Sequence, residues 1–309
     1  MKIRKAVFAV AAIFCIFFWS CSAKMEIPSY IWIDSVDFQV SNSALQGTAS
    51  HRITDVRVYA NGQSLGFYQL PARIPILESG NTKFNIHAGF MIGGVPQKRA
   101  EYPFYTPYMM DVNLKKGEID TVRPYFTYTH NAKFDLKEDF ESAGTTFAAY
   151  ENSAPLKRTS DASLIFHYPK ELNNYSGLVE LPYESDTQTV YHFEIRTVQP
   201  INLTPSTALD CLMELNFRIT HNVEIGMILH SSNSSIAEQI PLANLSGYDA
   251  INSTTSNVWR KVYVNCFDDE VRKKVYQMKN FDIYIRATIP QKDKARFLFD
   301  NIKIVYTEY

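Results

Sequence analysis

The chain lacks the short motifs that mark many hydrolases. Its 309 residues contain no Gly-x-Ser-x-Gly pattern and no His-Glu-x-x-His pair, and its seven histidines are scattered. Positive charge is also limited, because 31 basic residues stand against 32 acidic ones, a formal net charge of −1 at pH 7. A chain without a basic excess has no electrostatic footprint for nucleic acid. The sequence therefore predicts neither a familiar catalytic centre nor a nucleic-acid partner.

Cysteine is rare and shows no metal-binding spacing. Of the four cysteines, Cys15 and Cys21 lie near the N-terminus, which leaves Cys211 and Cys266 in the body of the chain. Both fall on inward-facing positions of expected strands. In an exported protein such a pair can form a disulfide. Two buried free thiols, which pack like small apolar residues, are the alternative.

Aromatic residues are abundant although glycine is not. The chain holds 19 Tyr and 20 Phe but only 12 Gly, and 46% of its residues are hydrophobic. Tyrosine and phenylalanine favour strands, and this much apolar material is ample for packed cores. We therefore expect an all-β protein whose length suits two domains.

The N-terminus has the pattern of an export signal. Lys2, Arg4 and Lys5 form a basic start, and residues 6–19 form an unbroken apolar run. This run is shorter than the roughly twenty residues that a membrane-spanning helix needs. The pattern predicts a secretory signal peptide over residues 1–20.

The end of this signal resembles that of bacterial lipoproteins. Cys21 follows the small residue Ser20, although Phe18 and Trp19 stand where leucine and a small residue are more usual. In that family the cysteine becomes the acylated first residue of the mature protein. The resemblance implies a lipid on Cys21, a membrane as partner through that lipid, and a tether over residues 21–29.

The tether resembles those of Bacteroides-type lipoproteins, in which acidic residues just after the cysteine direct the protein to the cell surface. Glu26 is the one acidic residue here that could serve. The resemblance implies an outer-membrane location. It leaves open whether the protein faces the periplasm or the cell exterior.

Residues 30–132 show short alternating strands with turns at regular spacing, the pattern of an antiparallel β-sandwich. The clearest signal is Asn61-Gly62 between two alternating runs, because both residues tolerate positive φ in a tight hairpin. The segment around this hairpin resembles the small β-sandwich repeats of the PEGA kind. That resemblance implies an Ig/PEGA-like module that acts as a spacer or faces a partner. The matching residues are Val58, Tyr59, Asn61, Gly62, Gly66, Pro71 and Gly80.

Residues 133–309 contain longer expected strands, which suit a two-sheet jelly roll. The closing segment 297–304, with its Phe-Asp-Asn-Ile run, resembles the last strand of carbohydrate-binding jelly rolls. The opening acidic segment 138–141 resembles their first strand. In similar jelly rolls a cation joins these two strands, and the resemblance therefore implies a Ca²⁺ site at Glu138, Glu141 and Asp300. The ordinary alternative is a solvated strand entry.

Strand alternation also suggests a ligand-binding surface. It places Trp259, Lys261 and Tyr263 on one face of a strand, opposite Val262 and Cys266. An outward aromatic pair beside a cation is typical of a face that binds sugars, but it also occurs in ordinary strands. The aromatic and proline-rich segment 102–108 is either an exposed contact loop or a cover over its own domain.

These observations lead to one hypothesis and two alternatives. The chain is expected to be a lipid-anchored cell-envelope protein that binds a glycan or a protein partner without catalysis. One alternative is a structural subunit of an envelope or surface assembly. The other is a glycan-cleaving enzyme on the jelly roll, which needs a pair of carboxylates across a cleft.

Overall fold

The computed structural model describes residues 26–169, 173–231, 237–247, 258–274 and 278–308. Their regular structure is almost entirely strand, and the two short helices among them are α2 (Ser43–Gln46) and α3 (Asp269–Lys273). The expected all-β fold is therefore confirmed. No helix in these ranges is long and apolar enough to cross a membrane.

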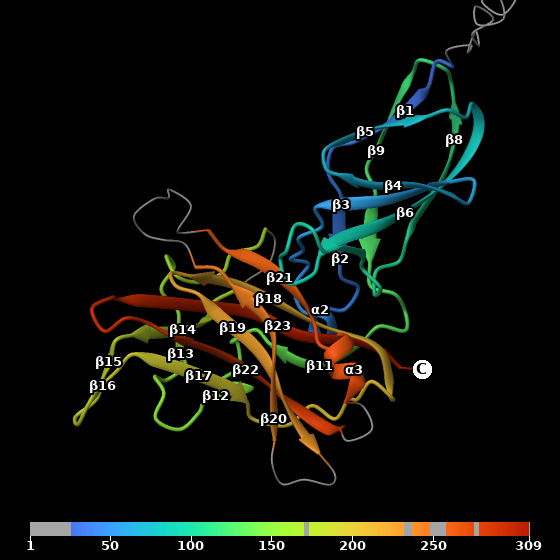
Figure 1. The fold of residues 1–309 in the computed structure, drawn as a ribbon. Coiled ribbons are helices and arrows are strands. Elements are labelled where there is room, and N and C mark those ends of the chain that lie inside the picture. Colours follow the sequence, from blue (N-terminus) through green and yellow to red (C-terminus); the bar gives the residue numbers. More distant parts are fainter. Residues whose placement is uncertain (1–25, 170–172, 232–236, 248–257, 275–277, 309) are drawn as a thin grey trace, which may run out of the picture.

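The N-terminal domain is built from three small sheets (Figure 1). The first contains β5 (Ala72–Ile76), β1 (Ser29–Ile33) and β9 (Ile119–Val122), and the second pairs β10 (Tyr125–Thr127) with β2 (Asp37–Gln39). The third contains β4 (Gln63–Gln69), β3 (Asp55–Ala60), β6 (Gly80–Met91) and β7 (Arg99–Glu101), and β8 (Tyr108–Leu114) pairs with β6.

The predicted hairpin is present between β3 and β4. Asn61 and Gly62 have φ angles of 49° and 83°, and they connect the paired residues Ala60 and Gln63. Two other strand pairs in this domain, β1 with β9 and β2 with β10, are parallel. The purely antiparallel sandwich expected for the domain is therefore wrong in this respect. β9 and β10 return only after the whole third sheet, and a long connection of this kind allows parallel pairing, which a hairpin does not.

The C-terminal domain is an eight-stranded jelly roll. One sheet has the order β14 (Ser176–Leu181), β23 (Ala295–Glu308), β18 (Ala208–Ile219) and β21 (Arg260–Asn265). The other has the order β17 (His192–Thr197), β22 (Met278–Thr288), β19 (Val223–Ser231) and β20 (Glu238–Leu245). Successive strands mostly alternate between the two sheets, and all the pairs within them are antiparallel, as expected for this fold.

Short strands extend both sheets. The first becomes six-stranded through β11 (Lys133–Glu138) and β13 (Lys157–Thr159), and the second becomes five-stranded through β12 (Phe147–Ala149). A separate hairpin joins β15 (Tyr183–Glu184) and β16 (Thr189–Val190). The jelly-roll core lies between the two sheets, and it includes Met213 and Val264 from one sheet and Ile283 from the other.

The N-terminal domain packs on the outer face of the six-stranded sheet (Figure 1). Its buried cluster takes in Leu212, Tyr263 and Val305, which come from the three strands β18, β21 and β23. The connecting strand β11 belongs to both units, because Phe134 packs on the N-terminal cluster and Leu136 on the jelly-roll core. The two domains therefore share a continuous packed junction.

Cys211 and Cys266 face each other at one end of β18 and β21. The Cys266 N–H donates to the Cys211 carbonyl oxygen at 2.9 Å, and both side chains are fully buried free thiols. Of the two alternatives for this pair, the structure has the thiols unbridged. Burial first, and then a hydrogen bond between the two thiols, raises the pKa of Cys211 well above its usual value.

We expect both thiols to resist alkylation in the native protein, because the thiolate is the reactive form and burial suppresses it. After unfolding without reductant, peptide mapping by mass spectrometry should find both Cys211 and Cys266 labelled with iodoacetamide. An unreduced, unfolded chain that takes up no label at these positions would instead reveal a disulfide.

Candidate functional site

Two of the predicted sugar-binding residues are buried. Lys261 and Tyr263 do lie on the face of β21 opposite Val262, as alternation predicted, but they are only 3% and 2% exposed. The N-terminal domain covers this face. The prediction that the pair faces an external ligand is therefore wrong, because periodicity tells which side of a strand a residue is on but not what lies above it.

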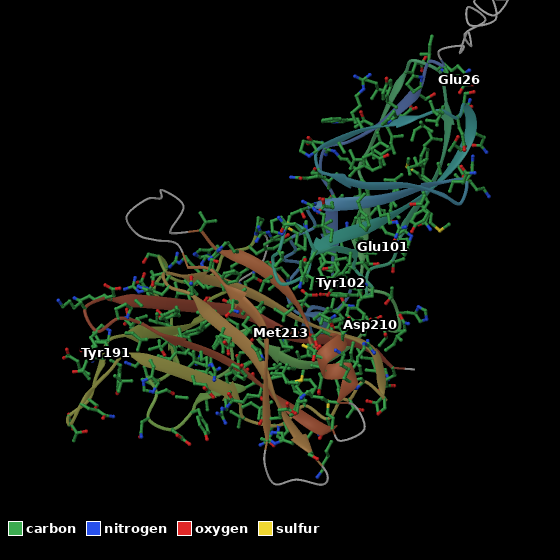
Figure 2. The ribbon with its side chains drawn as sticks, viewed as in Figure 1. Glu26, Glu101, Tyr102, Tyr191, Asp210 and Met213 are labelled. Carbon is green, nitrogen blue, oxygen red and sulfur yellow. The ribbon has the colours of Figure 1, made fainter. Side chains whose placement is uncertain are left out.

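Lys261 instead belongs to a buried charge cluster between the domains. Its Nζ lies 2.6 Å from Oε2 of Glu214, and Nζ of Lys303 lies 3.6 Å from the same oxygen. The other carboxylate oxygen accepts hydrogen bonds from the hydroxyls of Tyr102 and Tyr128, the latter at 2.7 Å. Figure 2 shows Tyr102 at the junction of the two domains. The jelly roll thus supplies the charges, and the N-terminal domain supplies two hydroxyl donors.

Main-chain groups of the N-terminal domain complete this cluster. Lys261 Nζ donates to the carbonyl of Ser50 at 2.7 Å, and Lys303 Nζ donates to that of Gln46 at 2.6 Å. The Tyr263 hydroxyl accepts from the Arg52 N–H at 2.8 Å. A buried charge is costly unless it is paired and hydrogen-bonded, so these contacts fix the orientation of one domain on the other.

The segment 102–108 covers the same junction. Tyr102, Phe104 and Tyr105 are at most 4% exposed, and the rings of Tyr102 and Tyr105 lie 3.9 Å apart between centroids. The segment is therefore not an exposed contact loop, and it packs on the jelly roll as well as on its own domain. Its two prolines interrupt regular strand structure before β8, and the rings of Tyr102, Phe104 and Tyr105 fill the gap between the domains.

Trp259 is only half-buried, and a different part of the chain packs on it. Its ring packs edge to face on Phe166 with centroids 5.3 Å apart, and its Nε1 donates to the Ile165 carbonyl at 3.2 Å. The guanidinium of Arg218 lies 5.6 Å from the ring centroid. The segment 161–168 therefore contacts one side of Trp259, which keeps part of its surface exposed.

The three predicted calcium ligands do not form a common site. Glu138 accepts hydrogen bonds from the backbone of Phe140 and Thr146, whereas Glu141 accepts from Asn174 and Tyr175. No group of three or more His, Cys, Asp or Glu side chains in the described ranges is arranged to hold a metal ion. The predicted Ca²⁺ site at Glu138, Glu141 and Asp300 is therefore not supported.

Asp300 is a buried structural carboxylate. It accepts hydrogen bonds from the Ser176 hydroxyl at 2.5 Å and from the Asn301 N–H at 2.7 Å. Burial first, with smaller contributions from Asp139 and Glu141, raises its pKa well above the usual value. The predicted lipid site, Cys21, lies outside the described residues.

The outer face of the five-stranded sheet carries a polar surface that the sequence did not single out. On β22, Asp282, Tyr284 and Arg286 alternate with the buried residues Ile283 and Ile285. Their cross-strand neighbours on β17 and β19 are mostly polar as well. We call this surface the polar face; it comprises Tyr150, Glu194, Arg196, Glu224, His230, Gln239, Asp282, Tyr284 and Arg286.

Arg286 is the centre of the polar face. It lies between Glu194 on β17 and Glu224 on β19, with nitrogen-to-oxygen distances of 3.7 and 2.7 Å. It also donates to Oε1 of Gln239 at 3.0 Å, and the Tyr284 hydroxyl donates to Glu224 at 2.7 Å. The two carboxylates keep 15% and 28% of their side-chain surface exposed, and Arg286 keeps 38%. These side chains thus form a row across the sheet, joined by ion pairs and hydrogen bonds and still accessible to solvent.

An exposed aromatic ring lies beside this row. Tyr150 is 39% exposed, and the guanidinium of Arg196 sits 3.2 Å from its ring centroid. Arg196 also lies 2.5 Å from Glu194. On the other side, His230 Nε2 lies 2.7 Å from Oδ2 of Asp282. The face therefore presents an aromatic ring followed by alternating hydrogen-bond donors and acceptors.

A glycine allows Tyr284 to lie flat on the sheet. A Cβ at Gly226, its cross-strand neighbour, would come within 2.2 Å of the Tyr284 hydroxyl and ring. The guanidinium of Arg286 covers the ring from the other side at 4.7 Å from its centroid. Tyr284 is fully buried, so it supports the polar face and leaves contact with a ligand to its neighbours.

A pocket of about 330 Å³ opens at the end of this sheet. It lies where β17 ends and β12 begins, beside the strand β11. Its lining is mainly apolar and includes Leu136, Val198, Pro200 and Ile201, with Asp135 at the edge. Burial raises the pKa of Asp135. The pocket adjoins the polar face without belonging to it.

The sequence did contain a signal for the polar face. His192, Glu194 and Arg196 alternate with core residues, as do the polar residues of β22. This pattern shows that each strand has one polar side. It does not show that Glu194, Arg286 and Glu224 are neighbours, because that depends on the order β17-β22-β19 and on register.

No family model matches the chain, and no curated protein does. Solved structures with some likeness include the CBM22-1 and GH10 modules of a Clostridium thermocellum xylanase complexed with xylohexaose. They are 8% identical, with 56% of this chain and 28% of that chain covered and a TM-score of 0.36. This chain thus spans well under half of that protein.

Two further solved structures align with this chain over almost their whole length. One is the CBM22-1 xylan-binding domain from Paenibacillus barcinonensis, with 10% identity, 59% of this chain and 99% of that chain covered, and a TM-score of 0.36. The other is the family 11 carbohydrate-binding module of a cellulosomal cellulase from Clostridium thermocellum. It has 12% identity, with 56% of this chain and 95% of that chain covered, and a TM-score of 0.34.

The ionised state of Glu214 makes the stability of the domain junction depend on pH. Burial alone would raise the pKa of this carboxyl, but Lys261 and Lys303 outweigh burial and lower the pKa to about 2. A folded-state pKa below the unfolded value of 4.5 gives stability that is complete above pH 4.5 and is lost as the pH falls towards 2. His51, whose pKa is lowered to about 4 by burial and then by Lys261, contributes a separate loss between pH 6.5 and 4.

We expect Glu214→Gln to lower the free energy of unfolding at pH 7 by about 3–5 kcal/mol, because it removes the negative charge beside two buried ammonium groups. The variant should also lack the decline in stability between pH 4.5 and 2 that the pKa of Glu214 predicts for the unsubstituted protein. Urea unfolding across this range measures both effects. Glu118→Gln, at a carboxylate that is 60% exposed, serves as control. Equal acid dependence in the Glu214 variant and the unsubstituted protein would contradict the assignment.

Proposed function

We propose that this protein is a lipid-anchored component of the outer membrane that binds a glycan through the polar face, without catalysis. The observation that carries this proposal is the contrast between the two outer faces of the jelly roll. On one face the N-terminal domain buries Lys261 and Tyr263, and the segment 161–168 packs on Trp259 and leaves it half-buried. The other face keeps an accessible row of aromatic, guanidinium, carboxylate and amide groups.

The chemistry of this row suits a sugar chain. A sugar hydroxyl both donates and accepts hydrogen bonds, and the row offers guanidinium donors next to carboxylate and amide acceptors. Arg286 and Glu224 present such a pair 2.7 Å apart, and Arg196 and Glu194 present a second one. The exposed ring of Tyr150 offers a flat surface for the apolar face of a sugar ring. Because the row crosses several strands, it suits an extended glycan.

The same contacts favour binding over cleavage. Glycoside hydrolysis needs one carboxyl that gives up a proton and a second that attacks or activates water. Glu194 and Glu224 both pair with Arg286, and Asp282 pairs with His230. Each of these carboxylates is thus held by a nitrogen-bearing side chain of the protein, an arrangement that suits a fixed acceptor of hydrogen bonds.

The alternative of an assembly subunit has less support. It relied on the aromatic segment 102–108 as an exposed contact, and the aromatic rings of Tyr102, Phe104 and Tyr105 are buried in the domain junction. Anchoring is supported by the signal-like N-terminus and by Cys21. In this arrangement the N-terminal domain is a rigid spacer between the lipid and the jelly roll.

The polar face predicts a specific loss of binding. Tyr150→Ala should weaken the affinity for a bound glycan about tenfold, because it removes the exposed stacking ring and the partner of Arg196. A glycan array with the detergent-solubilised protein identifies the ligand, and calorimetry then compares the variants. Tyr125→Ala, at a 52% exposed tyrosine in the N-terminal domain, should bind as the unsubstituted protein does.

Three results would contradict the proposal. The first is an array with no saturable glycan signal while a defined protein partner is captured. The second is equal affinity of the two tyrosine variants. The third is the appearance of new reducing ends when the bound glycan is incubated with the protein, which would establish cleavage.

A further inference from the structure

The end of the N-terminal domain that is farthest from the jelly roll carries three exposed aliphatic side chains. Ile27, Leu77 and Ile119 are 62%, 66% and 50% exposed. They come from three separate parts of the sequence: the first described residues, the end of β5, and the start of β9. Large apolar residues exposed together often mark an interaction surface.

Hydrogen bonds hold these three parts of the chain together. The Gly117 N–H donates to the Pro28 carbonyl at 3.0 Å, and the Tyr30 N–H donates to the Glu118 carbonyl at 2.9 Å. Ser29 Oγ donates to the Glu78 carbonyl at 3.4 Å. The turn 115–118 and the segment around Leu77 therefore flank the first described residues. We call this end, with Ile27, Leu77, Ile119 and the turn 115–118, the anchor tip.

The anchor tip is also where the chain leaves towards its N-terminus. Figure 2 shows Glu26 at this end of the molecule, away from the jelly roll. Ile27 follows Cys21 by six positions, and six extended residues reach about 20 Å at most. A lipid on Cys21, which is part of the function proposed above, would thus hold the anchor tip close to the bilayer surface.

Charge at the anchor tip does not favour an electrostatic contact. The turn carries Lys115, Lys116 and Glu118, and Glu26 and Glu78 lie beside it. Two positive and three negative groups leave no basic excess for anionic lipids. The aliphatic groups are therefore the part of this surface that gains from leaving water.

We propose that the anchor tip rests in the interfacial layer of the membrane that carries the lipid on Cys21. Ile27, Leu77 and Ile119 then enter the boundary between head groups and acyl chains. Aliphatic side chains that enter this boundary add to membrane affinity in proportion to the apolar area they bury. The long axis of the protein stands away from the membrane, and the polar face is carried outward on the jelly roll.

The chain offers a closely matched control. Leu45, in α2 at the opposite end of the N-terminal domain, is 63% exposed, against 66% for Leu77. Both leucines can be replaced by tryptophan without disturbing a core. The acylated protein is reconstituted in liposomes that contain nitroxide-labelled lipids, and fluorescence quenching is measured relative to the unsubstituted protein.

The added fluorescence of Leu77→Trp should be quenched severalfold more strongly than that of Leu45→Trp, and raising the salt concentration should not change this ratio. Equal quenching of the two variants, in a protein that still floats with the liposomes, would overturn the anchor-tip proposal and leave the lipid anchor intact. A protein that fails to float would overturn both. Glycan affinity of the same variants, measured in detergent, reports on the polar face independently.

Discussion

The structure depends on one buried carboxylate. Glu214 lies on the outer face of a jelly-roll sheet, where an isolated domain would leave it in water. In this protein it is fully buried, Lys261 and Lys303 both lie beside one of its oxygens, and two tyrosine hydroxyls from the other domain donate to its second oxygen. Such a group is tolerated only while all its partners are in place. The orientation seen here supplies all of these partners, and it buries Lys261 and Tyr263 on the outer face of that sheet.

This constraint explains where sequence reasoning succeeded and where it failed. Alternation correctly separated Val262 and Val264 from Lys261 and Tyr263, and Asn61-Gly62 correctly marked a hairpin, because both patterns depend on neighbours within a few residues. The partner that covers Lys261 begins more than two hundred positions earlier, at Ser50. No local pattern carries that information, so a correct assignment of the strand face led to a wrong prediction of exposure. The parallel pairing of β1 with β9 was missed for the same reason.

The polar face illustrates the complementary case. Its residues were visible as polar positions within alternating strands, yet their meaning came only from assembly. Glu194 and Glu224 are thirty positions apart in the sequence and become the two neighbours of Arg286 because β22 lies between β17 and β19. Because Gly226 has no side chain, the Tyr284 ring can pack directly on the backbone of the sheet. A jelly roll is a fold that hosts many functions, and it is this surface chemistry, read residue by residue, that favours recognition of a sugar chain.

The position of β1 has a mechanical consequence. It is the central strand of its small sheet, with β5 antiparallel on one side and β9 parallel on the other. A load between a membrane tether and a ligand held on the jelly roll would pull this strand along its own axis. Its hydrogen bonds to both neighbours would then be strained together in shear and would not open one after another like a zipper. The first strand of the domain is thus placed where a tethered receptor under flow or drag needs its greatest resistance.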